Sequence, residues 1–412
     1  MENINLSDYI PRPAYISRLL KYKDAPLVKI ISGIRRSGKS VLLKLFAGEL
    51  IRKGTKPQDI IYFSFDSLEY DGLDAKGLYS MIKEKLSVSD GKKKYVFLDE
   101  IQEIPGWEKA VNSLMQINAD IYVSGSNSKM LSSEISTYLT GRYVSVQVYP
   151  LSFKEYISFR KKQGRLENVR TEFARFLKFG GFPVIHIGNY QSDDAYRIIR
   201  DIYNSVIFTD IVKRTGIRKT DQFERIVKFV FSNVGSIFSA NSISNFFKSE
   251  KRPVDSDSIY SMLKGLENAF VISKCSRYDL QGKEILKTQE KYYLADSALR
   301  YAVLGYKDDS IAAMLENIIY LELRRRGYDV YVGKLYKGEI DFVAIKQGEK
   351  IYIQATQEIE SDATLEREYG VLAKIKDNYP KYVLRNDIFA ANDRNGIKTM
   401  PIYQFLLTEK WV

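Results

Sequence analysis

A glycine-rich segment near the start of the chain, Gly33-Ile-Arg-Arg-Ser-Gly-Lys-Ser40, constrains the fold more than any other part of the sequence. It matches the Walker A pattern G-x-x-x-x-G-K-[ST], in which the backbone N–H groups of a tight loop surround phosphate oxygens. The apolar run Leu27–Ile31 before it predicts a strand, and the apolar pattern of Ser40–Ile51 after it predicts a helix. A strand, a phosphate-binding loop and a helix N-terminus in this order favour an α/β fold built on the parallel sheet of a P-loop NTPase.

The loop and the first helical turn supply the candidate nucleotide-binding residues. The Lys39 ammonium can reach the β- and γ-phosphates of ATP, and the Ser40 hydroxyl can be a ligand of Mg²⁺. Arg35 and Arg36 either contribute to phosphate binding or face solvent. The complete candidate set is Gly33, Ile34, Arg35, Arg36, Ser37, Gly38, Lys39, Ser40 and Val41. We therefore expect ATP and Mg²⁺ as the ligands of this loop.

Two adjacent carboxylates end the apolar run Tyr95–Leu98, as in a Walker B strand. We expect Asp99 to hold Mg²⁺ with its hydration shell, and Glu100 to orient and deprotonate the attacking water. This division of roles suits phosphoryl transfer, where positioning and charge neutralisation supply most of the acceleration. The alternative for Glu100 is a solvated residue that merely follows a strand.

Polar side chains also follow the next predicted strand, Asp120–Ser124. In a sheet of this kind that strand end lies beside the γ-phosphate, so Asn127 is the candidate that orients the attacking water. Ser126 is the alternative, and a plain turn is the other interpretation. Together with a further strand at Ile60–Phe65, these near-continuous apolar strands predict a parallel sheet that is covered on both faces.

The combination of these motifs resembles the AAA+ and related STAND-like ATPases. More closely, it resembles a prokaryotic group of AAA-type ATPases whose C-terminal half is of unknown function. The stretches that carry the resemblance are Gly33–Ser40, Phe97–Gln102, Val123–Asn127, Leu139–Arg142, Pro150–Tyr156, Gly180–Pro183 and Gly338–Phe342. The resemblance implies that Arg142 is an arginine finger or sensor. Its cation would stabilise the negative charge of the transition state, from the same chain or from a neighbouring subunit.

The chain divides into four predicted parts. Residues 1–150 form the AAA-type P-loop domain, and residues 151–219 are a mostly helical lid or connector. Residues 220–305 contain three amphipathic helical patterns followed by a β-hairpin, which together predict a winged helix. Residues 306–412 alternate helices and strands and resemble the small α/β fold of restriction endonucleases.

The last of these parts departs from the pattern of an active nuclease. By the resemblance, an active member holds Mg²⁺ with two carboxylates and places a lysine two positions after the second. Glu316 and Asp341 match, but Gln354 stands at the second acidic position and Thr356 at the lysine position. An amide is a poorer Mg²⁺ ligand than a carboxylate, and threonine supplies no cation. We therefore expect an inactive domain; the alternative is an activity rescued by a relocated lysine such as Lys350.

The charge of the chain favours an anionic partner. There are 63 Lys and Arg against 51 Asp and Glu, a net charge of +12, and residues 211–300 hold sixteen basic and ten acidic residues of these. DNA phosphates could be contacted from this segment, whereas Asp255 and Asp257 begin the third helical pattern with the wrong charge for DNA. DNA and a protein partner, including a second copy of this chain in a homo-oligomer, are both candidate partners.

Other classes of protein are disfavoured. With one cysteine, Cys275, and one histidine, His186, the chain has no internal disulfide and no cysteine-rich or histidine-clustered metal site. Both residues are expected to pack in the interior. No apolar run is long enough to span a bilayer and no signal peptide is apparent, so we expect a cytoplasmic protein with no membrane partner.

The leading hypothesis is an ATP-hydrolysing switch or regulator that acts on another macromolecule. The first alternative is an ATP-dependent DNA-binding or DNA-processing protein with residual nuclease activity, which Gln354 and Thr356 disfavour. The second is a nucleotide-binding scaffold without turnover, which Glu100 disfavours.

Overall fold

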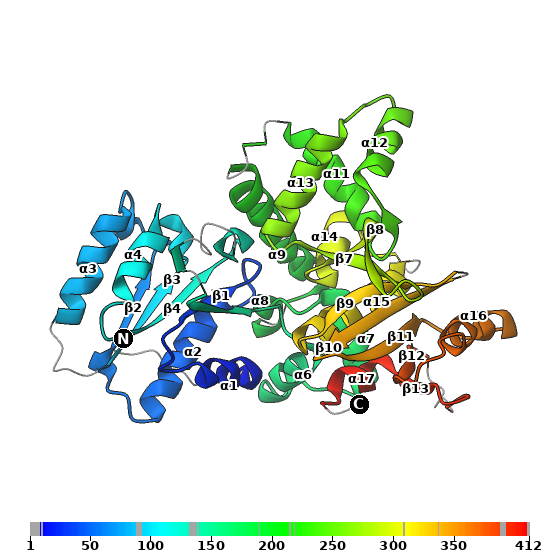
Figure 1. Ribbon diagram of the computed structural model, residues 1–412, viewed down its shortest axis with the longest axis horizontal. Helices are drawn as coiled ribbons and strands as arrows, with labels where there is room; N and C mark the ends of the chain where they lie inside the picture. The colour runs from blue at the N-terminus through cyan, green and yellow to red at the C-terminus, as the bar shows by residue number, and fades with distance from the viewer. Residues whose placement is uncertain are drawn as a thin grey trace. The chain divides into compact units, whose positions relative to one another are not determined.

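The computed structural model describes residues 9, 11–87, 93–131, 138–139, 141–188, 190–213, 216–217, 219–307, 310–336, 338–387 and 393–409. The chain divides into two compact units (Figure 1). The first comprises Met1–Tyr149 with Asn268–Phe270, and the second comprises Pro150–Glu267 with Val271–Val412. Each unit has its own β-sheet.

The first unit contains a five-stranded sheet in which every neighbouring pair of strands is parallel. Its order is β2-β3-β4-β1-β5, so β4 lies between β1 and β3. The strands are β1 (Val28–Ser32), β2 (Ile60–Ser64), β3 (Lys94–Asp99), β4 (Ala119–Gly125) and β5 (Tyr143–Gln147). The predicted α/β class with a parallel P-loop sheet is confirmed. β5 lies beyond the strands that the sequence predicted.

Helices cover both faces of this sheet, as the near-continuous apolar strands predicted. Side chains alternate along each strand: Ile30 and Val96 pack with α3 and α4, whereas Ile31 and Phe97 pack with α1 and α2. The helices that cover the two faces in the described residues are α1 (Pro13–Lys21), α2 (Lys39–Arg52), α3 (Ala75–Ser87) and α4 (Trp107–Leu114). Short 3-10 turns are η2 (Pro57–Asp59), η3 (Leu68–Tyr70), η4 (Ile101–Glu103) and η5 (Ser128–Leu131).

The second unit is built on one eight-stranded sheet of order β13-β12-β11-β10-β9-β7-β8-β6. Its strands are β6 (Ile237–Phe238), β7 (Ile272–Asp279), β8 (Glu284–Leu294), β9 (Asp329–Lys334), β10 (Glu339–Lys346), β11 (Glu349–Thr356), β12 (Lys381–Arg385) and β13 (Lys398–Pro401). The hairpin β7–β8 joins the later strands because β7 pairs in parallel with β9, Arg277 lying opposite Val332. The predicted boundary at residues 305 and 306 therefore separates strands that share one sheet.

Helices account for most of the remaining residues of the second unit. They are α6 (Phe153–Lys162), α7 (Val169–Phe179), α8 (Pro183–Ile187), α9 (Ser192–Ser205), the π-helix η6 (Val206–Val212), α11 (Thr220–Ser232), α12 (Ala240–Ser249), α13 (Ser256–Asn268), α14 (Ser297–Leu304), α15 (Ile311–Arg325), α16 (Asp362–Ala373) and α17 (Ile402–Leu407). The three helices α11, α12 and α13 precede the hairpin in the predicted order. Among the described residues, no helix combines the length and the apolar character that crossing a bilayer requires.

The Gly180-Gly-Phe-Pro183 segment owes its glycines to close packing within the second unit. Gly180 has φ +66°, and a Cβ at this position would lie 1.7 Å from Asp296 Oδ1. Asp296 is fully buried; it accepts hydrogen bonds from Gly181 N at 2.6 Å and, as the N-cap of α14, from Ala298 N at 2.9 Å. His186, also buried, lies with its Nε2 2.9 Å from Gly180 O, and burial lowers its pKa to about 4.

Asp296 makes the stability of the second unit dependent on pH. Burial raises the pKa of this carboxyl from 3.8 to about 6, although the two N–H donors favour the ionised form. A raised pKa contributes stability that is complete below the unfolded value and is lost as the pH rises through the folded value. We expect Asp296 to lower the free energy of unfolding by about 3 kcal/mol between about pH 4 and pH 8. Denaturant unfolding of the Asp296→Asn variant should lack this decrease; equal pH dependence in both proteins would contradict the assignment.

Candidate functional site

The loop between β1 and α2 has the conformation that a phosphate-binding loop needs. Gly33 has φ +152°, and a Cβ there would lie 2.1 Å from Val148 O, so only glycine fits. Arg36 and Gly38 also have positive φ, 65° and 94°. Gly38 is the N-cap of α2 and provides no side chain to cap it. Gly38 thus leaves the first-turn N–H groups of α2 without a side-chain cap. Uncapped N–H groups at a helix N-terminus favour the binding of an anion.

Lys39 is held inside the loop rather than extended into solvent. Its side chain is 3% exposed, and its Nζ donates hydrogen bonds to Gly33 O at 3.0 Å and to Ile34 O at 3.2 Å. The same ammonium lies 3.8 Å from Glu100 Oε1. The structure thus brings together the Walker A lysine and the second carboxylate of the Walker B strand.

Asp99 is buried at the end of β3 and is oriented by two hydroxyl groups. Tyr62 OH donates to Asp99 Oδ2 at 2.8 Å, and Ser124 Oγ donates to Asp99 Oδ1. Burial and the nearby Asp99 charge raise the pKa of Tyr62 above its usual value, so this phenol stays protonated and remains a donor. A carboxylate fixed in this way still has lone pairs for a hydrated cation.

Glu100 leaves the strand in a left-handed conformation, with φ 50°. Its backbone N–H donates to Ser124 Oγ at 3.2 Å, and its Oε2 accepts from Gln102 Nε2 at 2.5 Å. The side chain is 16% exposed. These contacts direct the carboxylate toward Lys39 and do not support the alternative of a fully solvated residue.

The end of β4 adds polar groups at the same edge of the sheet. Ser32 pairs with Gly125, so the residues that follow β4 lie next to the loop that follows β1. Ser126 and Asn127 are both buried there. The hydroxyls of Ser37 and Ser126 are buried and have no hydrogen-bond partner among the described residues. Polar groups buried in this way normally have partners, so the edge fits a phosphate-bearing ligand and its cation.

The remaining predicted loop residues differ in exposure. Ile34 is buried, Arg35 and Ser40 are half-buried, and Arg36 is exposed. The half-buried Ser40, in the first turn of α2, can offer its hydroxyl to a cation beside Asp99. Val41 follows it in the same turn and is half-buried.

Arg142 and the loop lie at opposite ends of the parallel strands. It directly precedes β5, which pairs in parallel with β1, and its backbone O accepts from Val28 N at 2.9 Å. The distance to the loop along the strands is roughly 15–20 Å, at about 3.3 Å per residue. Its exposed side chain donates to Asn112 Oδ1 at 2.7 Å. The structure thus does not bring Arg142 to its own chain's loop. Thr140, of the same motif, lies outside the described residues.

Arg12 holds the loop through a contact that no sequence motif indicated. This buried side chain donates to Ser37 O at 3.1 Å and to Tyr149 O at 3.0 Å. Its guanidinium carbon lies 4.4 Å from the centre of the Tyr15 ring. Arg12 therefore ties the start of α1 to the loop through residues that are 25 and 137 positions away. No local pattern could have indicated contacts over these separations.

Of the two carboxylates predicted by the nuclease resemblance, both in the second unit, Asp341 is buried and Glu316 is half-buried. Gln354 lies opposite Asp341 on the neighbouring strand and accepts from Asp341 N at 3.3 Å, whereas Thr356 Oγ1 donates to Glu358 O at 3.1 Å. Lys350 Nζ donates to Tyr278 OH at 3.0 Å, which gives no support for Lys350 as a relocated catalytic lysine. Within the described part of the chain, no group of three or more His, Cys, Asp or Glu side chains is arranged to hold a metal ion.

Comparison with known families assigns two segments of the chain. Residues 25–157 match the family described as an AAA domain, and residues 170–310 match a Domain of unknown function (DUF8612). The first match contains the loop, Asp99, Glu100 and Asn127. Fold and site together define the first unit as an AAA-type domain with a P-loop.

Relatives extend over nearly the whole chain. An uncharacterised protein of Haemophilus influenzae is 38% identical over 400 residues, covering 97% of this chain and 98% of its own. This chain belongs to the same family as that protein. An uncharacterised protein of Methanocaldococcus jannaschii is 28% identical over 375 residues, covering 88% and 82%. Among solved structures, a Walker-type ATPase of Pyrococcus abyssi is similar with a TM-score of 0.49 and 16% identity, covering 72% of this chain and 96% of that one.

Proposed function

We propose that the chain binds ATP with Mg²⁺ at the loop Gly33–Ser40 and hydrolyses it to ADP and phosphate. The observation that carries the proposal is the meeting of Lys39 and Glu100, 3.8 Å apart, directly beside the buried Asp99. A cation for the phosphates, a carboxylate for a metal and a second carboxylate for water are the parts that phosphoryl transfer requires.

Each residue has a separate task in this proposal. The loop N–H groups and Lys39 bind and orient the phosphates, while Ser40 and Asp99 would hold Mg²⁺. When bound, the metal neutralises the charge that develops on the phosphate oxygens. Glu100 accepts the proton of the attacking water, and Asn127, or Ser126 beside it, orients that water. Arg12 keeps the loop in place by holding the Ser37 carbonyl.

We further propose that hydrolysis drives a switch or regulator that acts on another macromolecule. The full chain joins the ATPase unit to a second unit with its own sheet and a basic segment, which supports a macromolecular rather than a metabolic role. The test is ATP turnover by the purified protein with and without DNA. Turnover that requires Glu100 supports the ATPase. Turnover that is absent under every condition would favour the scaffold hypothesis.

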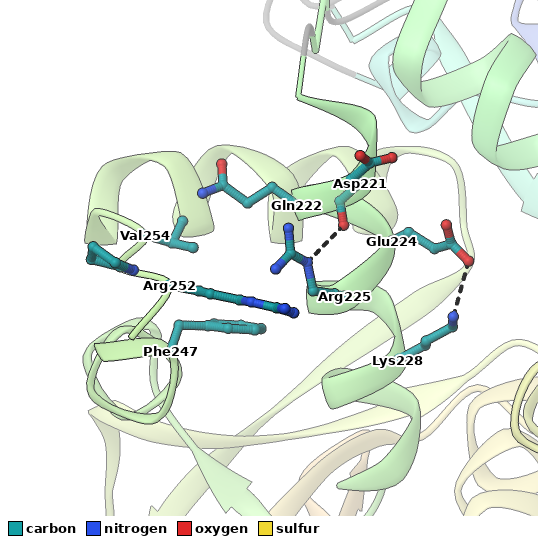
Figure 2. A pocket seen from close by; sticks show the side chains of 9 residues that line it. Asp221, Gln222, Glu224, Arg225, Lys228, Phe247, Arg252 and Val254 are labelled. Atoms are coloured by element: carbon teal, nitrogen blue, oxygen red, sulfur yellow. Dashed lines mark hydrogen bonds and ion pairs between the residues drawn. The ribbon is translucent and has the colours of Figure 1, made fainter. Parts of the chain in front are cut away.

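DNA is the candidate partner that a specific feature favours. Helix α11 and the segment between α12 and α13 line an open pocket of about 610 Å³ (Figure 2). Arg225, Lys228 and Arg252 line it, and Arg252 extends alongside the Phe247 ring. Cations beside an aromatic ring suit a nucleic-acid strand. Glu224 pairs with Lys228 at 3.0 Å and weakens the positive electrostatic potential of the pocket. A protein partner therefore stays the competing proposal.

The nuclease-like part is proposed to be without cleavage activity. Gln354 and Thr356 stand where an acid and a lysine are needed, and Lys350 contacts Tyr278 instead of the carboxylates. The check is incubation of supercoiled DNA, single-stranded DNA and RNA with Mg²⁺ or Mn²⁺. Cleavage that disappears in the Asp341→Ala variant would revive the DNA-processing hypothesis.

We propose that Arg142 acts at the nucleotide of a neighbouring subunit. The loop of its own chain lies at the opposite end of the parallel strands. Arg142→Ala should lower turnover by about 10³-fold, the lower range for an arginine finger. Mixing this variant with Lys39→Ala protein should restore part of the activity, measured as phosphate release. Arg52→Ala, at an exposed arginine paired with Glu49, is the matched control. Full activity of Arg142→Ala protein alone would refute the role in either arrangement.

A further inference from the structure

Two carboxylates of the second unit pair with one lysine from a distant part of the chain, and the charge of a third acts on it. Glu316 comes from α15, and Glu339 and Asp341 come from β10. Lys291 lies on β8 of the hairpin, opposite Cys275 on β7. Its Nζ is 2.8 Å from Glu339 Oε1 and 3.6 Å from Glu316 Oε2. The hairpin of the predicted winged helix thus sends an ammonium group into the acidic pocket of the nuclease-like part.

The pocket is partly open, because the side chains of Glu316 and Glu339 are 20% and 30% exposed, but its carboxylates are fixed from several sides. Lys291 is 5% exposed at its side chain. Tyr293 OH donates to Glu316 Oε2 at 3.2 Å, and Asp341 Oδ2 accepts from Ala355 N at 2.8 Å. Although burial opposes its charge, the carboxylates of Glu316, Asp341 and Glu339 raise the pKa of Lys291 above its usual value. The ion pairs with Glu339 and Glu316 hold the Lys291 ammonium in this pocket.

We propose that the Lys291 ammonium is the built-in cation of this pocket, occupying the place that a divalent metal ion would need between the carboxylates of Glu316 and Glu339. A hard divalent cation takes several oxygen ligands at about 2.0–2.6 Å. An ammonium 2.8 Å from Glu339 Oε1 and 3.6 Å from Glu316 Oε2 excludes such a cation sterically and by charge. Because Lys291 is part of the chain, it cannot be diluted or washed away. Removal of this single charge converts the pocket into a divalent-cation site.

The proposed role of Lys291 is separate from the loss of catalytic residues in this part of the chain. Gln354 and Thr356 explain why the pattern of an active nuclease is incomplete, yet they leave the carboxylates of Glu316 and Asp341 in place. These two carboxylates lie mostly out of contact with water, and carboxylates in that position need a counter-charge or a proton. Lys291 supplies the counter-charge and connects β8 with α15 and β10.

The test uses full-length protein with Asp99→Asn, so that the nucleotide site lacks the carboxylate proposed as its metal ligand. In this background Lys291→Met, which keeps the length of the side chain, should bind Mn²⁺ at least about tenfold more tightly, a change that titration with electron paramagnetic resonance resolves. Adding Glu316→Gln and Glu339→Gln should abolish the gain. Lys274→Met is the matched control, because Lys274 belongs to the same hairpin and pairs with Glu290 at a more exposed place.

Thermal unfolding gives a second measurement that also shows whether the variant folds. Mn²⁺ should raise the unfolding temperature of Lys291→Met protein more than that of its parent. Three results would overturn the proposal. The first is a Lys291→Met protein that gains neither affinity nor stability from Mn²⁺. The second is one that stays unfolded when Mn²⁺ is present. The third is tight Mn²⁺ binding by the parent protein that disappears with Glu316→Gln and Glu339→Gln.

Discussion

Lys39→Ala protein is expected to fold normally and to lose measurable ATP binding. The ammonium that it lacks is nearly fully buried and is positioned by the carbonyl groups of Gly33 and Ile34, within the loop that would receive the phosphates. Loss of a buried charged partner costs about 2–5 kcal/mol, which weakens binding by roughly 30- to 5,000-fold. Isothermal titration with ATP and Mg²⁺ measures the loss.

A matched control separates this effect from a general loss of positive charge. Lys53 follows the other end of the same helix and is 50% exposed at its side chain. Lys53→Ala removes the same charge from the C-terminal end of α2 and leaves the loop unchanged. The ATP affinity of this variant should therefore equal that of the unchanged protein. Near-normal affinity in folded Lys39→Ala protein would remove the basis for the whole site.

Glu100→Gln should separate binding from chemistry. The amide keeps the shape of the side chain and can still face Gln102, but it cannot accept the proton of the attacking water. Asp99 keeps its contacts to Tyr62 and Ser124, so metal and ATP should still bind. The expected loss of turnover is at least about 10²-fold, the lower range for a general base. Phosphate release and ATP affinity, measured on the same preparation, test both halves of this statement.

Glu103→Gln is the control for this variant. Glu103 is an exposed carboxylate three residues further on, and it also receives a contact from Gln102 Nε2, at 3.4 Å. Turnover of Glu103→Gln protein should be unchanged. If Glu100→Gln protein turns over as fast as the control, another group accepts the proton.

The sequence predicted the centre of the fold well because its signals are local. The apolar strands before the loop and before Asp99 are fully buried in a parallel sheet, as their composition indicated. β5 was missed, because Tyr143-Val-Ser-Val-Gln147 alternates polar and apolar residues and forms an edge strand. A strand of this kind lacks the continuous apolar run that identified its neighbours.

The site shows the same division between local and distant signals. Lys39, Asp99 and Glu100 come from contiguous motifs whose spacing fixes their chemistry. Arg12 and Lys291 have their partners far along the chain, so no window of sequence contains the interaction. Arg142 illustrates the converse. Its motif suggested a role at a nucleotide, but only the parallel pairing of β5 with β1 shows at which end of the strands Arg142 lies.

The pairing of β7 with β9 has a consequence for anyone who divides this chain experimentally. A fragment that stops at residue 305 would leave β7 as an open edge, with a row of unpaired N–H and C=O groups where β9 had been. Such edges recruit strands from other molecules, so the fragment would tend to aggregate. A deletion of residues 306–412 would then report on solubility rather than on the role of the missing part. Point substitutions such as Lys291→Met are the appropriate way to dissect the second unit, because its strands share one hydrogen-bonded sheet.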